Sequence, residues 1–148
     1  MIATTLTSLT SLTVFAALSG GGDVPLTPKE YEDVLRAIRI VESGEDPAAV
    51  GDGGRAIGVY QIWNVYWRDA VEFSGIGGVY GDCRDPAYAD VIVRAYMDRY
   101  AVPRRLGRYP TQEDIARIHN GGPNGHRKEA TLKYWQKVHT QMEKDKNG

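Results

Sequence analysis

The sequence has almost no cysteine, almost no charge imbalance and no pattern typical of a metal site. Its 148 residues include one cysteine, Cys83, which excludes an internal disulfide framework and any CxxC-type zinc or redox site. The 18 basic and 19 acidic residues give a net charge of -1, whereas proteins that bind a nucleic acid backbone usually carry a large basic excess. The three histidines, His119, His126 and His139, form no ligand motif. We therefore expect no nucleic acid partner, no metal and no cofactor.

The N-terminal segment differs in composition from the rest of the chain. Residues 1–24 contain no lysine or arginine and one acidic residue, Asp23. A stretch from Leu6 to Leu18 is rich in Thr, Ser and Leu, and small residues follow it before Gly20. This pattern is compatible with a secretory signal peptide that lacks a basic start, with a disordered leader, or with a misassigned start codon. The apolar run is too short and too interrupted to span a bilayer, so we expect no stable membrane insertion.

Residues 25–148 are long enough for one domain with a substantial core. Their charges are unevenly distributed. Residues 27–100 hold 8 basic and 13 acidic residues, whereas residues 104–148 hold 10 basic and 5 acidic residues. A basic C-terminal third could face an anionic polymer, and an ordinary solvated helix surface explains it equally well.

Helix signals dominate this domain. Thr27-Pro28-Lys29-Glu30 has a capping residue, a proline suited to the first helical position and the acid of a capping box, which predicts a helix up to about Gly44. The turn-rich segment 45–58 predicts a small hairpin or irregular wing. Further helices are expected over about 64–73, from Pro86, from Thr111 to about Gly121, and over about 128–144, the last with one apolar stripe. The predicted class is mainly α (α+β).

Two acidic residues stand out as a catalytic pair. Glu42 lies at the predicted C-terminal end of the first helix, where the helix dipole and apolar neighbours both raise a carboxyl pKa, as a general acid requires. Its alternative is an exposed residue at a fraying helix end. Asp52 lies ten residues later, where the wing could return it to the helix end as the second carboxylate of a glycosidase. The alternative interpretation of Asp52 is that it only favours the turn that it forms with the two glycines after it.

Several blocks together resemble invertebrate-type (i-type, destabilase-like) lysozymes, within the wider superfamily of lysozymes and soluble lytic transglycosylases. The resemblance covers roughly residues 34–138, and its blocks occur in the family's order. They are Glu42-Ser43-Gly44, Gly51-Asp52-Gly53-Gly54, Gly58-Val59-Tyr60-Gln61-Ile62, Tyr66-Trp67, Tyr96-Met97-Asp98-Arg99-Tyr100, Ala116–Gly125 and Leu132-Lys133-Tyr134-Trp135.

The resemblance implies a lysozyme-like fold in which helices flank a cleft and a small β wing holds Asp52. It implies a muramidase that hydrolyses the β-1,4 link between N-acetylmuramic acid and N-acetylglucosamine in peptidoglycan strands, with Glu42 as general acid. The residues that it places at the substrate are Ser43, Gly58, Tyr60, Gln61, His119, Asn120 and Gly121. The family is rich in disulfides, so this chain represents a branch that depends on packing and helix caps instead.

Two other functions remain open at this point. A lytic transglycosylase would use Glu42 alone, and a non-catalytic wall-binding module would keep the cleft without the chemistry. The aromatic residues Tyr60, Trp63, Tyr66 and Trp67 could supply flat faces for sugar rings or pack in the core and wing. For Trp63 and Trp67 packing is the favoured interpretation. The resemblance also predicts a monomer that acts outside the cytoplasm, because peptidoglycan lies there.

Overall fold

A computed structural model describes residues 22–148. Residues 1–21 lie outside the described part, and with them almost all of the expected leader at 1–24. Within residues 22–148, no helix is both long enough and apolar enough to cross a membrane.

The first helix, α1 (Pro28–Ser43), begins and ends where the sequence predicts. The hydroxyl of Thr27 accepts a hydrogen bond from the backbone N–H of Glu30 at 3.2 Å, and Oε2 of Glu30 accepts one from the backbone N–H of Thr27 at 2.8 Å. Gly44 ends the helix in the left-handed conformation, with a φ of 66°. The predicted capping box and glycine stop are both confirmed, and they fix the position of Glu42 in the last helical turn.

A small antiparallel sheet follows α1 and forms the predicted wing. Its strands are β1 (Val50–Gly51), β2 (Ala56–Ile57) and β3 (Ile62–Trp63), in the order β1-β2-β3, with Ile57 paired to both Val50 and Ile62. A 3₁₀ turn, η1 (Asp52–Gly54), joins the first two strands. Asp52 therefore lies at the tip of a short hairpin.

The rest of the described chain is helical, with one difference from the prediction near its end. The further elements are α2 (Asn64–Ser74), η2 (Tyr80–Arg84), α3 (Pro86–Tyr100), α4 (Pro103–Leu106), α5 (Gln112–Gly121), η3 (Gly125–Arg127), η4 (Glu129–Thr131) and α6 (Leu132–Asn147). The last helix begins at Leu132 rather than near Lys128, because a 3₁₀ turn precedes it. The predicted class, mainly helical with a small β wing, is confirmed.

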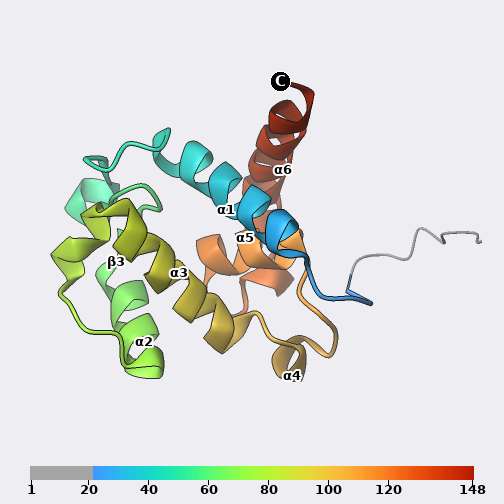
Figure 1. Cartoon of the computed structure of the whole chain (residues 1–148), viewed down its shortest axis with the longest axis horizontal. Helices are drawn as coiled ribbons and strands as arrows, with labels where there is room; N and C mark the ends of the chain where they lie inside the picture. The colour runs from blue at the N-terminus through green and yellow to red at the C-terminus, as the bar shows by residue number, and fades with distance from the viewer. Residues whose placement is uncertain (1–21) are drawn as a thin grey trace, which may run out of the picture.

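The core lies among α1, α3, α5 and the wing. Helix α1 packs against α6 and α5, while α2 packs against α3 (Figure 1). Fully buried apolar side chains include Leu35 and Ile38 of α1, Ile92 of α3, Ile118 of α5 and Val138 of α6. Cys83 is buried as a free thiol, so packing and caps hold these described elements together.

Candidate active site

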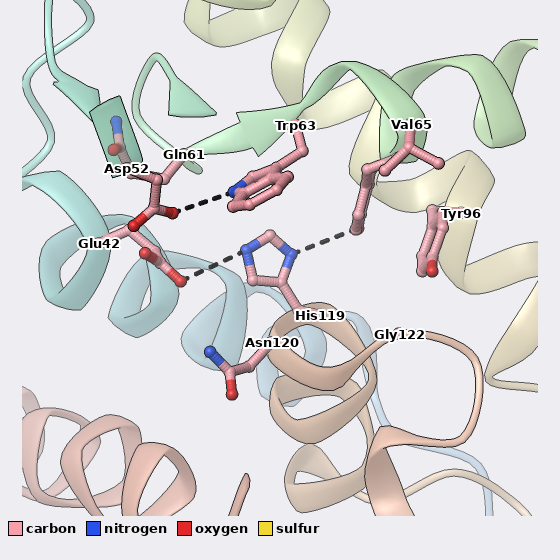
Figure 2. Close-up of a pocket in the computed structure, with 10 residues that line it drawn as sticks. Glu42, Asp52, Gln61, Trp63, Val65, Tyr96, His119, Asn120 and Gly122 are labelled. Carbon is pink, nitrogen blue, oxygen red and sulfur yellow. Dashed lines mark hydrogen bonds and ion pairs between the residues drawn. The ribbon is translucent and has the colours of Figure 1, made fainter. Parts of the chain in front are cut away.

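A pocket of about 380 Å³ lies where the wing meets the helices (Figure 2). Its walls come from α1, the wing, α2, α3 and the C-terminal end of α5. The lining residues are Glu42, Asp52, Gln61, Trp63, Val65, Tyr66, Tyr96, His119, Asn120 and Gly122. Both acidic residues that the sequence singled out therefore face one pocket.

Glu42 lies on the helical wall of this pocket, in the last turn of α1, with a side chain that is 20% exposed. Burial raises the pKa of Glu42 and is the largest influence on it. The hydroxyl of Tyr134 donates a hydrogen bond to Oε1 of Glu42 at 2.7 Å, which lowers the pKa. The negative charge of Asp52 raises the pKa and the positive charge of Lys137 lowers it. Because burial is the largest influence, the pKa of Glu42 is raised overall. The predicted rise is confirmed, with burial as its main cause.

Asp52 belongs to the wing side of the pocket and is exposed. Its φ of 51° is in the left-handed region, which aspartate tolerates better than most residues. The indole N–H of Trp63 donates to its Oδ2 at 3.0 Å, and Nε of Arg55 donates to its backbone carbonyl at 2.9 Å. The Arg55 guanidinium also lies 4.7 Å from the centre of the Trp63 ring system. The wing thus orients this carboxylate through two neighbours that contact each other.

His119 of α5 lies beside Glu42, and its side chain is only 4% exposed. Its Nε2 is 3.1 Å from the backbone carbonyl of Tyr60, which can only accept, so Nε2 carries the hydrogen. Its Nδ1 then accepts from the hydroxyl of Tyr66 at 3.3 Å. Burial lowers the pKa of His119 to about 4, so the ring is neutral at pH 7. The 3.7 Å approach of Nε2 to Oε1 of Glu42 is therefore no ion pair at that pH.

Comparison with known proteins identifies the family of the chain. The sequence model of the family described as Destabilase matches residues 31–141. The chain belongs to the Destabilase family. Among its relatives, a lysozyme of Magallana gigas is 41% identical over 110 residues, which are 72% of this chain and 77% of the relative. Invertebrate-type lysozyme 6 of Caenorhabditis elegans is 32% identical over 111 residues, which are 70% of this chain and 80% of the relative.

A solved structure agrees with these relatives in fold. The crystal structure of Tapes japonica lysozyme superposes with a TM-score of 0.61 at 34% identity, covering 72% of this chain and 86% of that one. The resemblance inferred from the sequence is confirmed, and so is the lysozyme-like fold. Because these relatives are named lysozyme, this Destabilase member is a glycoside hydrolase.

Five of the nine site residues expected for a Destabilase member line the pocket: Glu42, Asp52, Gln61, His119 and Asn120. Gln61 has a φ of 49°, and its amide N–H groups donate to the carbonyls of Ala49 and Gly58 at 3.2 and 3.0 Å. These bonds tie the segment before β3 to the start of the wing. Gln61 therefore braces the wing as well as facing the pocket.

Two polar residues expected at the substrate are structural. The expectation that the Tyr60 side chain lines the cleft is wrong, because that side chain is 0% exposed. Its hydroxyl donates to Oδ1 of Asp90 at 2.6 Å and accepts from Arg39 at 2.9 Å. Only its backbone carbonyl serves the site, through His119. The hydroxyl of Ser43 shares its one hydrogen between the carbonyls of Arg39 and Val59, at 3.1 and 2.9 Å, and the contact with Val59 anchors the wing to α1.

Two glycines expected at the substrate are required by packing. Gly58 has a φ of 74°, and a Cβ there would clash with the backbone carbonyl of Cys83 in η2. A Cβ on Gly121 would lie 2.5 Å from the methyl group of Thr131. Its neighbour Gly122 lines the pocket instead.

The site residues expected from the sequence did not include Tyr134, which bonds to Glu42, nor five of the residues that line the pocket: Trp63, Val65, Tyr66, Tyr96 and Gly122. Trp63 is not a packing residue: it is 37% exposed, lines the pocket and bonds to Asp52. Strand alternation gives the signal for it, since Ile62 is buried and the next side chain points to the other face. Tyr134 stands four residues before the buried Val138, so helical spacing places both on one face of α6. Trp67, by contrast, packs against the core as predicted.

No metal site accompanies the pocket in the described chain. Within residues 22–148, no group of three or more His, Cys, Asp or Glu side chains is arranged to hold a metal ion.

Proposed function

We propose that this protein is a muramidase that hydrolyses the β-1,4 links of peptidoglycan with Glu42 as general acid and Asp52 as second carboxylate. One observation carries the proposal: two carboxyl groups line one pocket, in different environments. Burial raises the pKa of Glu42, whereas Asp52 is exposed and accepts a hydrogen bond from an indole. Such a contrast lets one carboxyl hold a proton while the other carries a negative charge.

In this mechanism the protonated Glu42 gives its proton to the glycosidic oxygen as the bond to the leaving sugar breaks. Positive charge then develops on the remaining sugar ring. The carboxylate of Asp52 either stabilises that charge or bonds to the ring as a nucleophile. Glu42, now ionised, takes a proton from the water that completes hydrolysis.

The other pocket residues suit a sugar substrate. The exposed ring of Trp63 offers a flat apolar face beside Asp52, and Asn120 with Gly122 offers amide groups opposite it. We assign these groups to the sugar ring and its acetamide substituent. The pocket volume of about 380 Å³ is within the range of small-molecule sites.

The location of the substrate extends the proposal. Peptidoglycan lies outside the cytoplasm, so we propose that the protein acts there as a monomer and that residues 1–24 act as its leader. Mass spectrometry of the protein recovered from its native cells tests this. A mature N-terminus near Gly20 in the extracytoplasmic fraction supports it, and an intact chain in the cytoplasm contradicts it.

The catalytic proposal is tested on purified cell walls with wild type, Glu42→Gln and Glu72→Gln. Glu72 is an exposed residue of α2 outside the pocket, so its substitution is the matched control. We expect Glu42→Gln to lower the rate of wall clearing by about 10³-fold, in the range of general acid catalysis, and Glu72→Gln to leave it unchanged.

Mass analysis of the released sugars separates the rival functions. Products with a reducing end identify hydrolysis, whereas products with an internal anhydro ring identify a lytic transglycosylase. Binding of walls without any release of sugar by the wild type identifies a wall-binding module. Either of the last two results overturns the proposed function.

A further inference from the structure

The contact between Tyr134 and Glu42 joins two helices that are far apart in sequence. Glu42 lies in the last turn of α1 and Tyr134 in the first turn of α6, and the two helices pack against each other (Figure 1). The hydroxyl of Tyr134 is 2.7 Å from Oε1 of Glu42. Burial raises the pKa of Tyr134 well above its usual range, so the hydroxyl keeps its hydrogen and donates it.

We propose that Tyr134 is a positioning residue for Glu42, which holds Oε1 and leaves Oε2 to carry the proton given to the substrate. The inference rests on the proposed role of Glu42 as general acid. It names a residue on α6 that controls which carboxyl oxygen acts as the acid.

The hydrogen-bond donors around Glu42 are unevenly distributed between its two oxygens. Oε1 accepts the hydrogen bond from the Tyr134 hydroxyl at 2.7 Å and lies 3.7 Å from Nε2 of His119, whose hydrogen bonds to the Tyr60 carbonyl (the contact with His119 is dashed in Figure 2). Within residues 22–148, no side-chain hydrogen bond reaches Oε2. A proton on Oε1 would confront the hydrogen that Tyr134 donates, whereas a proton on Oε2 confronts no side-chain donor of the described residues. The donor arrangement therefore favours Oε2 as the proton carrier.

Four groups on three elements set the charge balance at Glu42. Asp52 of η1 raises its pKa, Lys137 of α6 lowers it, and His119 of α5 is neutral at pH 7. The hydrogen bond from Tyr134 lowers the pKa by stabilising the ionised carboxylate. Loss of the Tyr134 hydroxyl therefore raises the pKa of Glu42 as well as freeing its side chain to rotate.

The variant Tyr134→Phe tests this inference against a merely structural tie between α1 and α6. The matched control is Tyr100→Phe, which also removes a tyrosine hydroxyl that donates to a carboxylate, Oδ2 of Asp69, at 2.6 Å outside the pocket. The measurements are kcat and KM on a soluble peptidoglycan oligosaccharide across the pH range, with circular dichroism as a check of folding.

We expect Tyr134→Phe to lower kcat about tenfold with KM unchanged, because the lost contact orients the acid rather than the substrate. The basic limb of its pH profile moves up by about one pH unit, since the acid stays protonated to higher pH. Tyr100→Phe keeps both kcat and the limb. A profile for Tyr134→Phe that is scaled down without moving overturns the inference.

A second variant keeps the test decisive if Tyr134→Phe does not fold. A 3-fluorotyrosine at position 134 retains the hydroxyl and makes it a stronger donor, so the basic limb moves to lower pH, opposite to the phenylalanine variant. An unmoved limb in this folded variant also overturns the inference. Activity retained by Glu42→Gln would instead overturn the proposed function, so the two failures are distinguishable.

Discussion

The two walls of the pocket present the same chemical group in opposite settings. Glu42 ends a 16-residue helix packed against α5 and α6, and its side chain is 20% exposed. Asp52 opens a three-residue turn in a wing of two-residue strands, and it is exposed. Burial favours the neutral form of Glu42, as its proposed role of general acid requires, whereas no such burial surrounds Asp52.

The walls also differ in how the backbone positions each carboxyl. Within residues 22–148, the three non-glycine residues with positive φ are Glu45, Asp52 and Gln61, all within or beside the wing. Helix α1 contains none of them. The helical wall positions its acid by packing, whereas the wing positions its carboxylate by strained turns and the contacts of Trp63 and Arg55.

Among the variants that test this difference between the two walls, Asp52→Asn is expected to have the largest effect on activity. It keeps the size of the side chain and the acceptor for the Trp63 indole, but it removes the negative charge that faces the sugar. We expect the rate of sugar release to fall about 10²-fold, within the range of electrostatic stabilisation. Asp46→Asn, at the start of the wing and outside the pocket, is the control. Activity retained by Asp52→Asn would indicate that Glu42 acts alone, as in a lytic transglycosylase.

A smaller effect is expected when the support of Asp52 is removed. Trp63→Phe deletes the indole N–H that donates to Oδ2 at 3.0 Å, so the carboxylate is free to rotate. We expect kcat to fall about tenfold, as for a lost orienting contact. Trp67→Phe deletes an indole N–H that donates to the Tyr88 hydroxyl, also at 3.0 Å, and should leave kcat unchanged. Equal losses in the two variants would refute the special role of Trp63.

The helical wall was largely predictable from the sequence, because its signals are local. The capping box at Thr27 and the stop at Gly44 fix the ends of α1, and apolar spacing indicates which face is buried. The position and raised pKa of Glu42 follow from those signals. Its hydrogen bond to Tyr134 does not, because that contact depends on how α6 packs against α1, 92 residues away in sequence.

The wing was predictable as an element but not in its side-chain directions. Residues 58–61 form a turn in which Gly58 and Gln61 both have positive φ. The family resemblance predicted Tyr60 in the cleft, and strand alternation could not correct this prediction because positive φ values break the alternation of side chains between the two faces of a strand. In the structure the Tyr60 ring is buried, and only its backbone carbonyl contributes to the site, through the hydrogen bond from His119.

The pH dependence of the residual activity of Asp52→Asn tests whether the charge of Asp52 influences Glu42. The negative charge of Asp52 raises the pKa of Glu42, so its removal lowers that pKa. A general acid loses activity as pH rises through its pKa, so we expect the basic limb to move to lower pH by about half a unit. A pH series of initial rates measures it. An unmoved limb would show that the two walls do not interact electrostatically.

The smallest expected effect concerns stability. It depends on the difference between the pKa of Glu42 in the folded protein and its pKa in the unfolded chain. The folded pKa of Glu42 is raised, so the folded state holds its proton more tightly than the unfolded state does. Stability is unaffected below the unfolded pKa of about 4.3, falls as pH rises from there through the folded pKa, and is then constant. Glu42→Gln cannot ionise and keeps an oxygen for Tyr134. We therefore expect its Tm to exceed that of the wild type by a few degrees at pH 7, and to match it below the unfolded pKa. Scanning calorimetry across this range, with Glu72→Gln as control, measures the gap. A gap that persists in acid would assign the stabilisation to packing rather than to removal of the buried negative charge.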